Sequence, residues 1–302
     1  MCPQRPDGFT GKNESKRDSQ AAGGEFIRPK KSLGQNFLND TRVVQDILCA
    51  AELGENDAVI EVGPGLGAMT GKLAEQAGFV AAVEIDSALI PALKKLEERC
   101  GNLAVTNRDI LKTDVRKDII EGVFLPRGLG GSVKVVANLP YYITTPIVMK
   151  FLEENSADID SLVIMVQKEV AERMTADPGG KDYGAMTVTV NYFSEPDIMF
   201  TVPPHCFYPR PGVDSAVVRL KMRKEPPFEL LNRDHFFLTV RAAFSQPRKT
   251  LTNALANAPY MNVTREKVAE VLAKMGKDVM VRGERLSPAE FGQLSNLLSV
   301  YL

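Results

Sequence analysis

The residues best suited to chemistry lie where apolar runs of the sequence end in glycine or in an acid. The run at residues 58–63 opens the series Gly63-Pro64-Gly65-Leu66-Gly67, which lets the backbone turn tightly and lets a ligand approach without Cβ interference. Glu84 stands 21 positions after Gly63, at the end of the next apolar run. A carboxylate at that spacing can accept hydrogen bonds from both hydroxyls of a ribose. These residues predict a nucleoside-binding site.

The spacing of the glycines indicates which kind of nucleoside ligand the site suits. A dinucleotide site favours G-x-G-x-x-G, whereas this chain has G-x-G-x-G, which suits a methionine-plus-nucleoside ligand without a pyrophosphate, so we expect S-adenosylmethionine as the cofactor. A tight turn without a ligand is the alternative for the glycines alone, and Glu84 argues against it. Asp109, after the third apolar run, is placed to accept from the adenine amino group, although alone it could be a solvated loop acid. Ile85 and Ile110, which follow these acids, are assigned to the same site.

A second group of residues, Asn138-Leu139-Pro140-Tyr141, ends the fourth apolar run and indicates transfer to an exocyclic amino group. The amino nitrogen of adenine is a poor nucleophile because its lone pair is delocalised into the ring. It needs acceptors that favour a pyramidal nitrogen, and the Asn138 side-chain carbonyl with the Leu139 backbone carbonyl could accept its N–H groups. Pro140 would fix the backbone so that both acceptors point together. We therefore expect catalysis by positioning, with the proton leaving after the nitrogen has attacked.

Two aromatic residues are candidates for holding a flipped base. Removing a base from its stack costs a few kcal/mol, and stacking on one aromatic ring returns about 1–3 kcal/mol. Tyr141 is expected to provide one face and Phe207, in a Pro-rich stretch, the other. Core packing is the alternative for each ring.

The elements that must position these residues alternate between strand and helix. Strands are predicted at residues 58–63, 80–85, 103–107, 133–138 and 162–167, and helices at 41–52, 66–76, 88–99, 145–153 and 168–174. Alternation of this kind indicates βαβ units and a mainly parallel sheet covered on both faces. The fold class is therefore α/β with a Rossmann-like sheet, and together with the S-adenosylmethionine site expected above it would be a class I methyltransferase sheet.

The pattern changes after Lys168. Residues 185–192 and 215–222 alternate like two further strands, and the remainder is predicted helical at 234–244, 249–256, 264–275 and 287–298. The last helix begins with Ser287-Pro288-Ala289-Glu290, a capping box with proline at the first helical position. We expect a disordered tail at 1–27, a cofactor-binding catalytic domain at 28–224 and an all-helical RNA-recognition domain at 225–302.

Charge is distributed unevenly along the chain. The net charge is only −1, but residues 205–250 contain nine Lys/Arg against four Asp/Glu and residues 1–35 contain seven against four. Such segregation fits a basic face that meets phosphates, with chance clustering on solvated loops as the alternative.

Several function classes are disfavoured. The four cysteines form no C-x-x-C pair and there are two histidines, so neither a disulfide framework nor a metal site is predicted. The neighbours His205 and Cys206 could form a catalytic pair, but a packing role for Cys206 is preferred. No apolar run is long enough to span a membrane and no secretory signal is present, and acids in the first 25 residues argue against a transit peptide. These observations predict a cytoplasmic protein, expected to be a monomer.

With these residues in place, the chain resembles the ribosomal small-subunit RNA adenine N6,N6-dimethyltransferase family, in its bacterial type. The resemblance runs from about Arg28 to the C-terminus, and its motifs are KSLGQNFL, EVGPGLG, VEID, RDIL, NLPYYITTP, VPPHCFYPRPGVDSAVVRL and RAAFSQPRKTL. It implies dimethylation of two adjacent adenosines in a hairpin near the 3′ end of the small-subunit RNA, during assembly of the subunit. It also implies that Asn36 and Leu38 close over the cofactor, that Gly63 lies beneath it, and that Asn138 faces cofactor and target.

Three alternatives stay open at this point. A relative that methylates large-subunit RNA and confers macrolide resistance would share the glycine series and the N-P-Y motif. A non-catalytic assembly or transcription factor could have kept the fold, although the intact Asn138 and Glu84 argue for activity. A small-molecule methyltransferase would not need the basic segment at 205–250.

Overall fold

A computed structural model describes residues 29–30 and 33–299, so the tail predicted at 1–27 lies outside the described residues. The chain divides into two compact units. Unit 1 contains the chain up to Lys168 together with Met199–Arg219, and unit 2 contains Glu169–Ile198 together with the chain from Leu220. Within the described ranges, no helix is long and apolar enough to cross a membrane.

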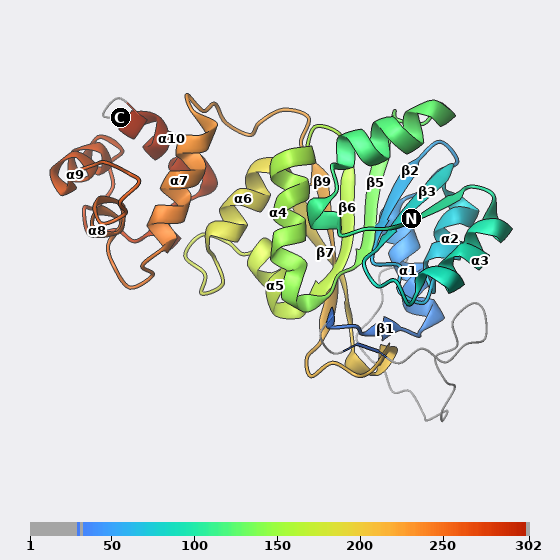
Figure 1. Ribbon diagram of the computed structural model, residues 1–302. Coiled ribbons are helices and arrows are strands. Elements are labelled where there is room, and N and C mark those ends of the chain that lie inside the picture. The colour runs from blue at the N-terminus through green and yellow to red at the C-terminus, as the bar shows by residue number, and fades with distance from the viewer. Residues whose placement is uncertain (1–28, 31–32, 300–302) are drawn as a thin grey trace. The chain divides into compact units, whose positions relative to one another are not determined.

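A seven-stranded sheet forms the centre of unit 1 (Figure 1). Its strands β4, β3, β2, β5 and β6 run parallel to their neighbours, and β9 and β7 follow at one side. The boundary between the units runs through β7 and β9. The strands, in sheet order, are β4 (Leu103–Asn107), β3 (Phe79–Glu84), β2 (Ala58–Val62), β5 (Val133–Asn138), β6 (Ser161–Gln167), β9 (Ser215–Met222) and β7 (Ser194–Val202). The predicted α/β fold with a mainly parallel sheet is confirmed.

The order of the strands explains where a ligand can bind. The chain moves outward from β2 to β3 and β4, and then returns to the other side of β2 to form β5. In open α/β sheets the crevice at such a reversal, outside the carboxyl ends of the strands, is where ligands bind. Val62 pairs with Ala137, so the glycine series after β2 and Asn138 at the end of β5 come to the same edge of the sheet.

Helices flank this sheet, and most were predicted from their apolar periodicity. They are α1 (Thr41–Ala51), α2 (Thr70–Gln76), α3 (Ile90–Cys100) and α4 (Thr144–Asn155). Helix α2 begins at Thr70 rather than near Leu66, because Gly65 and Gly67 have φ angles of +60° and +80° and cannot be helical. A π-helix at Val115–Phe124 was not predicted.

Unit 2 is helical. It contains α5 (Lys168–Met174) apart from its first residue, α6 (Ala185–Phe193), α7 (Arg233–Phe244), α8 (Leu251–Ala256), α9 (Arg265–Lys274) and α10 (Pro288–Leu298). The predicted capping box is present at α10, where the Glu290 amide donates to the Ser287 hydroxyl at 3.3 Å and the Ser287 amide donates to the Glu290 carboxylate at 2.8 Å. The helical character predicted for the C-terminal part is confirmed.

The strand predicted at residues 185–192 is wrong, because this segment is helix α6. Its β-branched residues alternate as in a strand, but Thr187, Val188, Thr189 and Val190 are all buried. A helix that is apolar all round shows no stripe with a period of 3.6, so the pattern could not reveal it. The start of the helix is marked instead by the Gly184 amide, which donates to the Thr187 hydroxyl at 3.1 Å.

The two compact units do not coincide with the domains predicted on either side of Lys224, and helix α6 explains the difference. Tyr192 and Phe193 of α6 belong to an aromatic cluster, with ring centroids 5.0–5.6 Å apart, that includes Phe228, Phe236 and Phe237. Aromatic rings contribute much of the energy of a core because each buries a large apolar area. Residues 169–198 therefore group with the C-terminal helices, which a single boundary in the sequence could not express.

Candidate functional site

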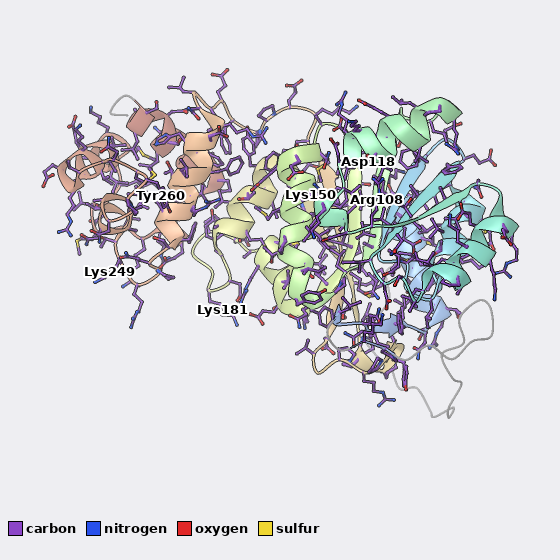
Figure 2. All side chains as sticks on the ribbon, in the orientation of Figure 1. Arg108, Asp118, Lys150, Lys181, Lys249 and Tyr260 are labelled. Carbon is purple, nitrogen blue, oxygen red and sulfur yellow. The ribbon has the colours of Figure 1, made fainter. Side chains whose placement is uncertain are left out.

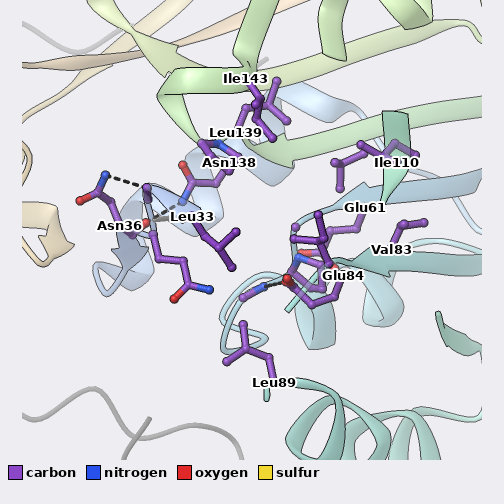
Figure 3. Close-up of a pocket in the computed structure, with 18 of the residues that line it drawn as sticks. Leu33, Asn36, Glu61, Val83, Glu84, Leu89, Ile110, Asn138, Leu139 and Ile143 are labelled. Atoms are coloured by element: carbon purple, nitrogen blue, oxygen red, sulfur yellow. Dashed lines mark hydrogen bonds between the residues drawn. The ribbon is translucent and has the colours of Figure 1, made fainter. Parts of the chain in front are cut away.

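A cavity opens at the carboxyl ends of β2, β3 and β5 (Figure 3). It encloses about 1050 Å³ of empty space, counting the part open to solvent. All but one of the predicted site residues line it: Asn36, Leu38, Gly63, Gly65, Glu84, Ile85, Asp109, Ile110, Asn138, Leu139, Pro140 and Tyr141. The topology thus brings together residues that are more than a hundred positions apart.

The glycine series forms one wall of the cavity. Gly63 and Gly65 have φ angles of +67° and +60°, a region that strains other residues. A Cβ atom on Gly63 would meet nothing within 4 Å and would project into open space, whereas one on Gly65 would lie 3.2 Å from the Phe37 ring. Glycine is therefore required for conformation at both positions, and at Gly63 it also leaves room for a ligand.

Glu84 lies at the end of β3 with 4% of its surface exposed. The amide of Gly65 donates to Oε2 at 3.1 Å and the amide of Asp86 donates to Oε1 at 2.8 Å. Burial raises the pKa of this carboxyl group, and these amide hydrogen bonds oppose the rise. The backbone thus fixes the orientation of the carboxylate while lone pairs on both oxygens stay available for further donors.

Asp109 follows β4 and caps a short helical turn. Its Oδ1 accepts from the Leu111 amide at 3.0 Å, so the side chain is held at the cavity wall. The neighbouring Arg108 also lines the cavity, and its guanidinium pairs with Asp118 at 2.7 Å (Figure 2). Ile110 is 5% exposed and Ile85 is 48% exposed, so of the two predicted apolar contacts Ile110 is buried and Ile85 is open to solvent.

Glu61, on the central strand β2, was not predicted to be part of the site. It lines the cavity, is fully buried, and neither carboxylate oxygen has a hydrogen-bond partner among the residues that the structure describes. Burial raises the pKa of Glu61 to about 8, and the nearby charge of Glu84 adds to the rise. An acid inside an apolar strand immediately before the glycine series was the signal in the sequence that could have identified it.

Asn138 ends β5, and its amide has a defined orientation. Its Nδ2 donates to the backbone carbonyl of Asn36 at 3.0 Å (Figure 3). Because the nitrogen is engaged there, the oxygen Oδ1 is the atom left to accept a hydrogen bond from a ligand. This is the polarity that an amino group requires.

The residues after Asn138 are held by their own contacts. The Leu139 amide donates to the Met165 carbonyl at 3.2 Å, and Pro140 has φ −60° and ψ 131°. The hydroxyl of Tyr141 hydrogen-bonds to the Ser215 hydroxyl at 2.7 Å, and burial raises the pKa of the phenol. The tyrosine is therefore neutral, with its ring anchored at the cavity wall.

Phe207 differs from the prediction. Its ring is 2% exposed and packs in the hydrophobic core, and it is not among the residues that line the cavity. The short strand β8 (Phe207–Tyr208) pairs with β1 (Phe37–Leu38), and this pairing carries the ring inward. In this structure Phe207 does not provide the second aromatic face. It packs in the core, which was the alternative given for this ring.

His205 and Cys206 do not form a catalytic pair. Cys206 is 3% exposed whereas His205 is exposed. Burial and the nearby Asp40 carboxylate raise the pKa of the thiol to about 11, so Cys206 is protonated at neutral pH and is not an activated nucleophile.

The remaining wall of the cavity comes from the segment before α1. Only the family resemblance, and not the spacing of its residues, placed Asn36 and Leu38 of this segment at the site. Residues 33–38, here called the strap, all line the cavity. Gly34 in the strap has φ +56°, and a Cβ there would lie 3.0 Å from the ring of Tyr142. The strap therefore packs closely against the residues that follow β5.

The comparisons with known proteins agree with this geometry. The family model described as ribosomal RNA adenine dimethylase matches residues 27–291. The chain belongs to the ribosomal RNA adenine dimethylase family. Membership confirms the resemblance identified from the sequence motifs, and it makes the chain an S-adenosylmethionine-dependent methyltransferase by family.

Curated members of the family are similar over nearly their whole length. A protein of Lachnoclostridium phytofermentans named ribosomal RNA small subunit methyltransferase A is 44% identical over 274 residues, 90% of this chain and 92% of that protein. The protein of the same name from Alkaliphilus oremlandii is 48% identical over 269 residues, 89% of this chain and 91% of that one.

Solved structures share the fold. A dimethyladenosine transferase from Plasmodium falciparum is 28% identical with a TM-score of 0.71, covering 85% of this chain and 95% of that one. The 23S rRNA methyltransferase ErmE is 27% identical with a TM-score of 0.66, covering 87% of this chain and 100% of that one.

Proposed function

We propose that this protein uses S-adenosylmethionine to dimethylate the exocyclic N6 of two adjacent adenosines in a hairpin near the 3′ end of small-subunit ribosomal RNA. Family membership supports the reaction, and relatives at 44–48% identity that are named for the small subunit support the substrate. ErmE, which is named for the 23S RNA, is less similar at 27% identity. The roles of individual residues given below are part of the proposal.

The cavity fits the cofactor. S-adenosylmethionine carries a cationic sulfonium and a cationic ammonium, and the carboxyl groups of Glu84 and Asp109 line the cavity. Opposite charge in a partly buried site is favourable because the surrounding dielectric is low. The open space above Gly63, which a Cβ would occupy, is a cradle of the kind that a nucleoside ligand needs.

Particular residues would hold each part of that cofactor. Glu84, fixed by two backbone amides, would accept from the ribose hydroxyls. Asp109 would accept from the adenine amino group, with Ile85 and Ile110 beside it. Asn36 and Leu38 of the strap would cover the ligand. When bound, S-adenosylmethionine supplies an electrophilic methyl group on a positively charged sulfur.

The observation that carries the proposal is the orientation of Asn138. With Nδ2 donating to the Asn36 carbonyl, Oδ1 can accept one N–H of the target amino group, and the Leu139 carbonyl can accept the other. Two acceptors held in place before the substrate arrives favour the pyramidal nitrogen, which is the form that can attack. No strong base is required, so the absence of a charged side chain within Asn138–Tyr141 is consistent with this chemistry.

Tyr141 would stack against the flipped base. Its ring lines the cavity, and the hydrogen bond to Ser215 keeps it in place without a further entropic cost when the base arrives. Stacking on one ring returns about 1–3 kcal/mol of the cost of flipping the base. Phe207 would have to leave the core to add a second face.

Basic residues of both units would bind the RNA. In the segment 205–250, Arg219 and Arg223 are paired with acids, at 2.7 Å from Glu52 and 2.9 Å from Glu195. Exposed basic side chains of the same segment are Arg210, Lys221, Lys224, Arg233, Arg241, Arg248 and Lys249. We propose that residues 225–302 recognise the RNA and residues 28–224 carry the chemistry. We further propose a monomer that acts in the cytoplasm on an assembly intermediate of the small subunit.

The test is methyl transfer from labelled cofactor to ribosomal subunits isolated from a strain that lacks the enzyme. We expect label in the small subunit alone, recovered after digestion to nucleosides as N6,N6-dimethyladenosine. Label in the large subunit alone would establish the macrolide-resistance activity instead. RNA binding should weaken steeply as salt rises, because binding releases counterions from phosphates; binding that is flat with salt would contradict the role given to the basic segment.

A further inference from the structure

The orientation of Asn138 depends on the strap rather than on its own strand. The torsion that turns a side-chain amide is broad, so Asn138 could present either oxygen or nitrogen to the cavity. The hydrogen bond of 3.0 Å from Nδ2 to the Asn36 carbonyl selects the oxygen. Asn36 in turn donates from its side chain to the Gly34 carbonyl at 3.3 Å, within the strap. Whatever fixes the strap therefore fixes the acceptor.

One end of the strap is anchored by backbone pairing. Strand β1 pairs antiparallel with β8, with Phe37 opposite Tyr208 and Leu38 opposite Phe207. The amide of Asn39, just beyond, donates to the Cys206 carbonyl at 2.9 Å. These contacts hold the strap after Asn36 but leave its preceding residues to be held by other means.

The other end is anchored by side chains that converge on Asp86. Gln35 donates from Nε2 to Asp86 Oδ2 at 2.8 Å, and Lys30 donates from Nζ to Asp86 Oδ1 at 2.6 Å. The Lys30 amide also donates to Oε1 of Gln35 at 2.8 Å. Both polar atoms of the Gln35 side chain are thus engaged, and they hold the residue next to Asn36 in position.

Asp86 links this anchor to the cofactor side of the cavity. It is 3% exposed, and its amide donates to Glu84 Oε1 at 2.8 Å. Burial alone would raise the pKa of Asp86, but hydrogen bonds from Lys30, Gln35 and the Ala88 amide outweigh it and lower the pKa below its ordinary value. Asp86 is therefore a carboxylate at neutral pH and attracts all of these donors.

We infer that Gln35 and Asp86 are positioning residues for methyl transfer, which hold the strap so that the Asn36 carbonyl keeps the Asn138 oxygen toward the target amino group. Neither side chain needs to touch the reacting atoms. The inference rests on the proposed role of Asn138, and it adds that the acceptor depends on a contact made 51 positions apart in the sequence, between Gln35 and Asp86.

A charge-swap cycle tests the inference. Gln35→Glu places a carboxylate against the Asp86 carboxylate, so this variant loses the contact. Asp86→Asn keeps an acceptor oxygen but removes the negative charge that attracts Gln35 and Lys30, so this variant weakens the contact. The double variant Gln35→Glu/Asp86→Asn restores it, because the new amide can donate to the new carboxylate. We expect kcat at saturating cofactor and RNA to fall about tenfold in Gln35→Glu, the factor for one lost hydrogen bond, to fall by a smaller factor in Asp86→Asn, and to recover in the double variant. The matched control Gln76→Glu, on α2, should keep the wild-type kcat.

A second readout does not depend on activity. The side-chain amide hydrogens of Asn138, followed by nitrogen NMR in the protein without RNA, are expected to exchange about tenfold faster in Gln35→Glu, and faster by a smaller factor in Asp86→Asn, than in the wild type or the double variant. A loss of fold would lower the thermal midpoint of a variant, so circular dichroism accompanies each measurement. If Gln35→Glu does not fold, Asp86→Asn and the double variant still decide the question.

The outcomes separate the inference from the proposed function. A wild-type kcat in both single variants overturns the inference, and so does a folded double variant that stays as slow as the single ones. Full activity in Asn138→Ala would overturn the proposed role of Asn138 itself. An inactive Asn138→Ala together with fully active single variants would overturn the inference alone.

Discussion

Replacing Glu61 by glutamine is expected to stabilise the protein increasingly as the pH rises. Glu61 is fully buried, its oxygens have no hydrogen-bond partner within the described part of the chain, and burial raises its pKa from an ordinary value of 4.5 to about 8. At a pH between these two pKa values, Glu61 has lost its proton in the unfolded chain and keeps it in the folded chain. The folded state therefore binds more protons, and the free energy of unfolding of the wild type falls as the pH rises.

The magnitude follows from the two pKa values. One pKa unit corresponds to about 1.4 kcal/mol, so the penalty grows by about 1.4 kcal/mol per pH unit from pH 4.5 and levels off near pH 8. The full difference is of the order of 5 kcal/mol. Glutamine has nearly the same shape and no charge, so Glu61→Gln removes this slope. Its amide adds a cost of its own, about 1–3 kcal/mol if it is left unpaired, but that cost does not change with pH.

The assay is urea unfolding of the wild type and Glu61→Gln at several pH values from 5 to 9, with the difference in free energy plotted against pH. We expect the difference to shift in favour of the variant through this range and to flatten above pH 8. Glu75→Gln is the matched control, because Glu75 is exposed on α2 and a surface change of this kind alters stability by about 0.5 kcal/mol or less. A Glu61→Gln difference that stays constant with pH would refute the reasoning.

Three further predictions concern residues that line the cavity. Glu84→Gln should weaken cofactor binding by about 10- to 100-fold in isothermal titration, because charge-assisted hydrogen bonds are worth about 1.5–3 kcal/mol; unchanged binding would place the ribose elsewhere. Gly65→Ala should lower the free energy of unfolding by about 1–2 kcal/mol, because alanine is strained at φ +60° and its Cβ would crowd Phe37. A variant as stable as the wild type in a thermal melt would show that the turn adapts. Tyr141→Ala should lower kcat/KM by about 10- to 100-fold. Tyr141→Phe keeps the ring and loses only the hydrogen bond to Ser215, so its kcat/KM should stay within about tenfold of the wild-type value. Equal losses in the two variants would show that the hydroxyl matters rather than the ring.

The residues at strand ends could be predicted from the sequence for a clear physical reason. Parallel strands end at one edge of the sheet, so side chains after successive apolar runs must meet there. Gly63, Glu84, Asp109 and Asn138 follow four such runs, and all four line the cavity. The capping box at Ser287 is equally local, and it is present in the structure.

What the sequence could not reveal depends on contacts between distant positions. Helix α6 was missed because it is buried on nearly every side, which removes the periodicity that distinguishes helix from strand. The bond from Gln35 to Asp86 joins residues with no shared pattern. Phe207 was expected at the cavity from its Pro-rich surroundings, but the pairing of β8 with β1 turns its ring into the core. Residue types alone do not decide on which side of a short strand a ring lies.

The central claim is that the Asn138 oxygen receives the target amino group, and a single-turnover experiment with Asn138→Ala tests it most directly. Enzyme saturated with cofactor is mixed with RNA to start the reaction, and the rate of methyl transfer within the complex is measured along with the Kd of the RNA. Loss of a preorganised hydrogen-bonding group typically costs about 100- to 1000-fold in rate, so we expect a loss of at least that size with the RNA Kd changed little. A variant that transfers methyl groups at the wild-type rate would contradict the account.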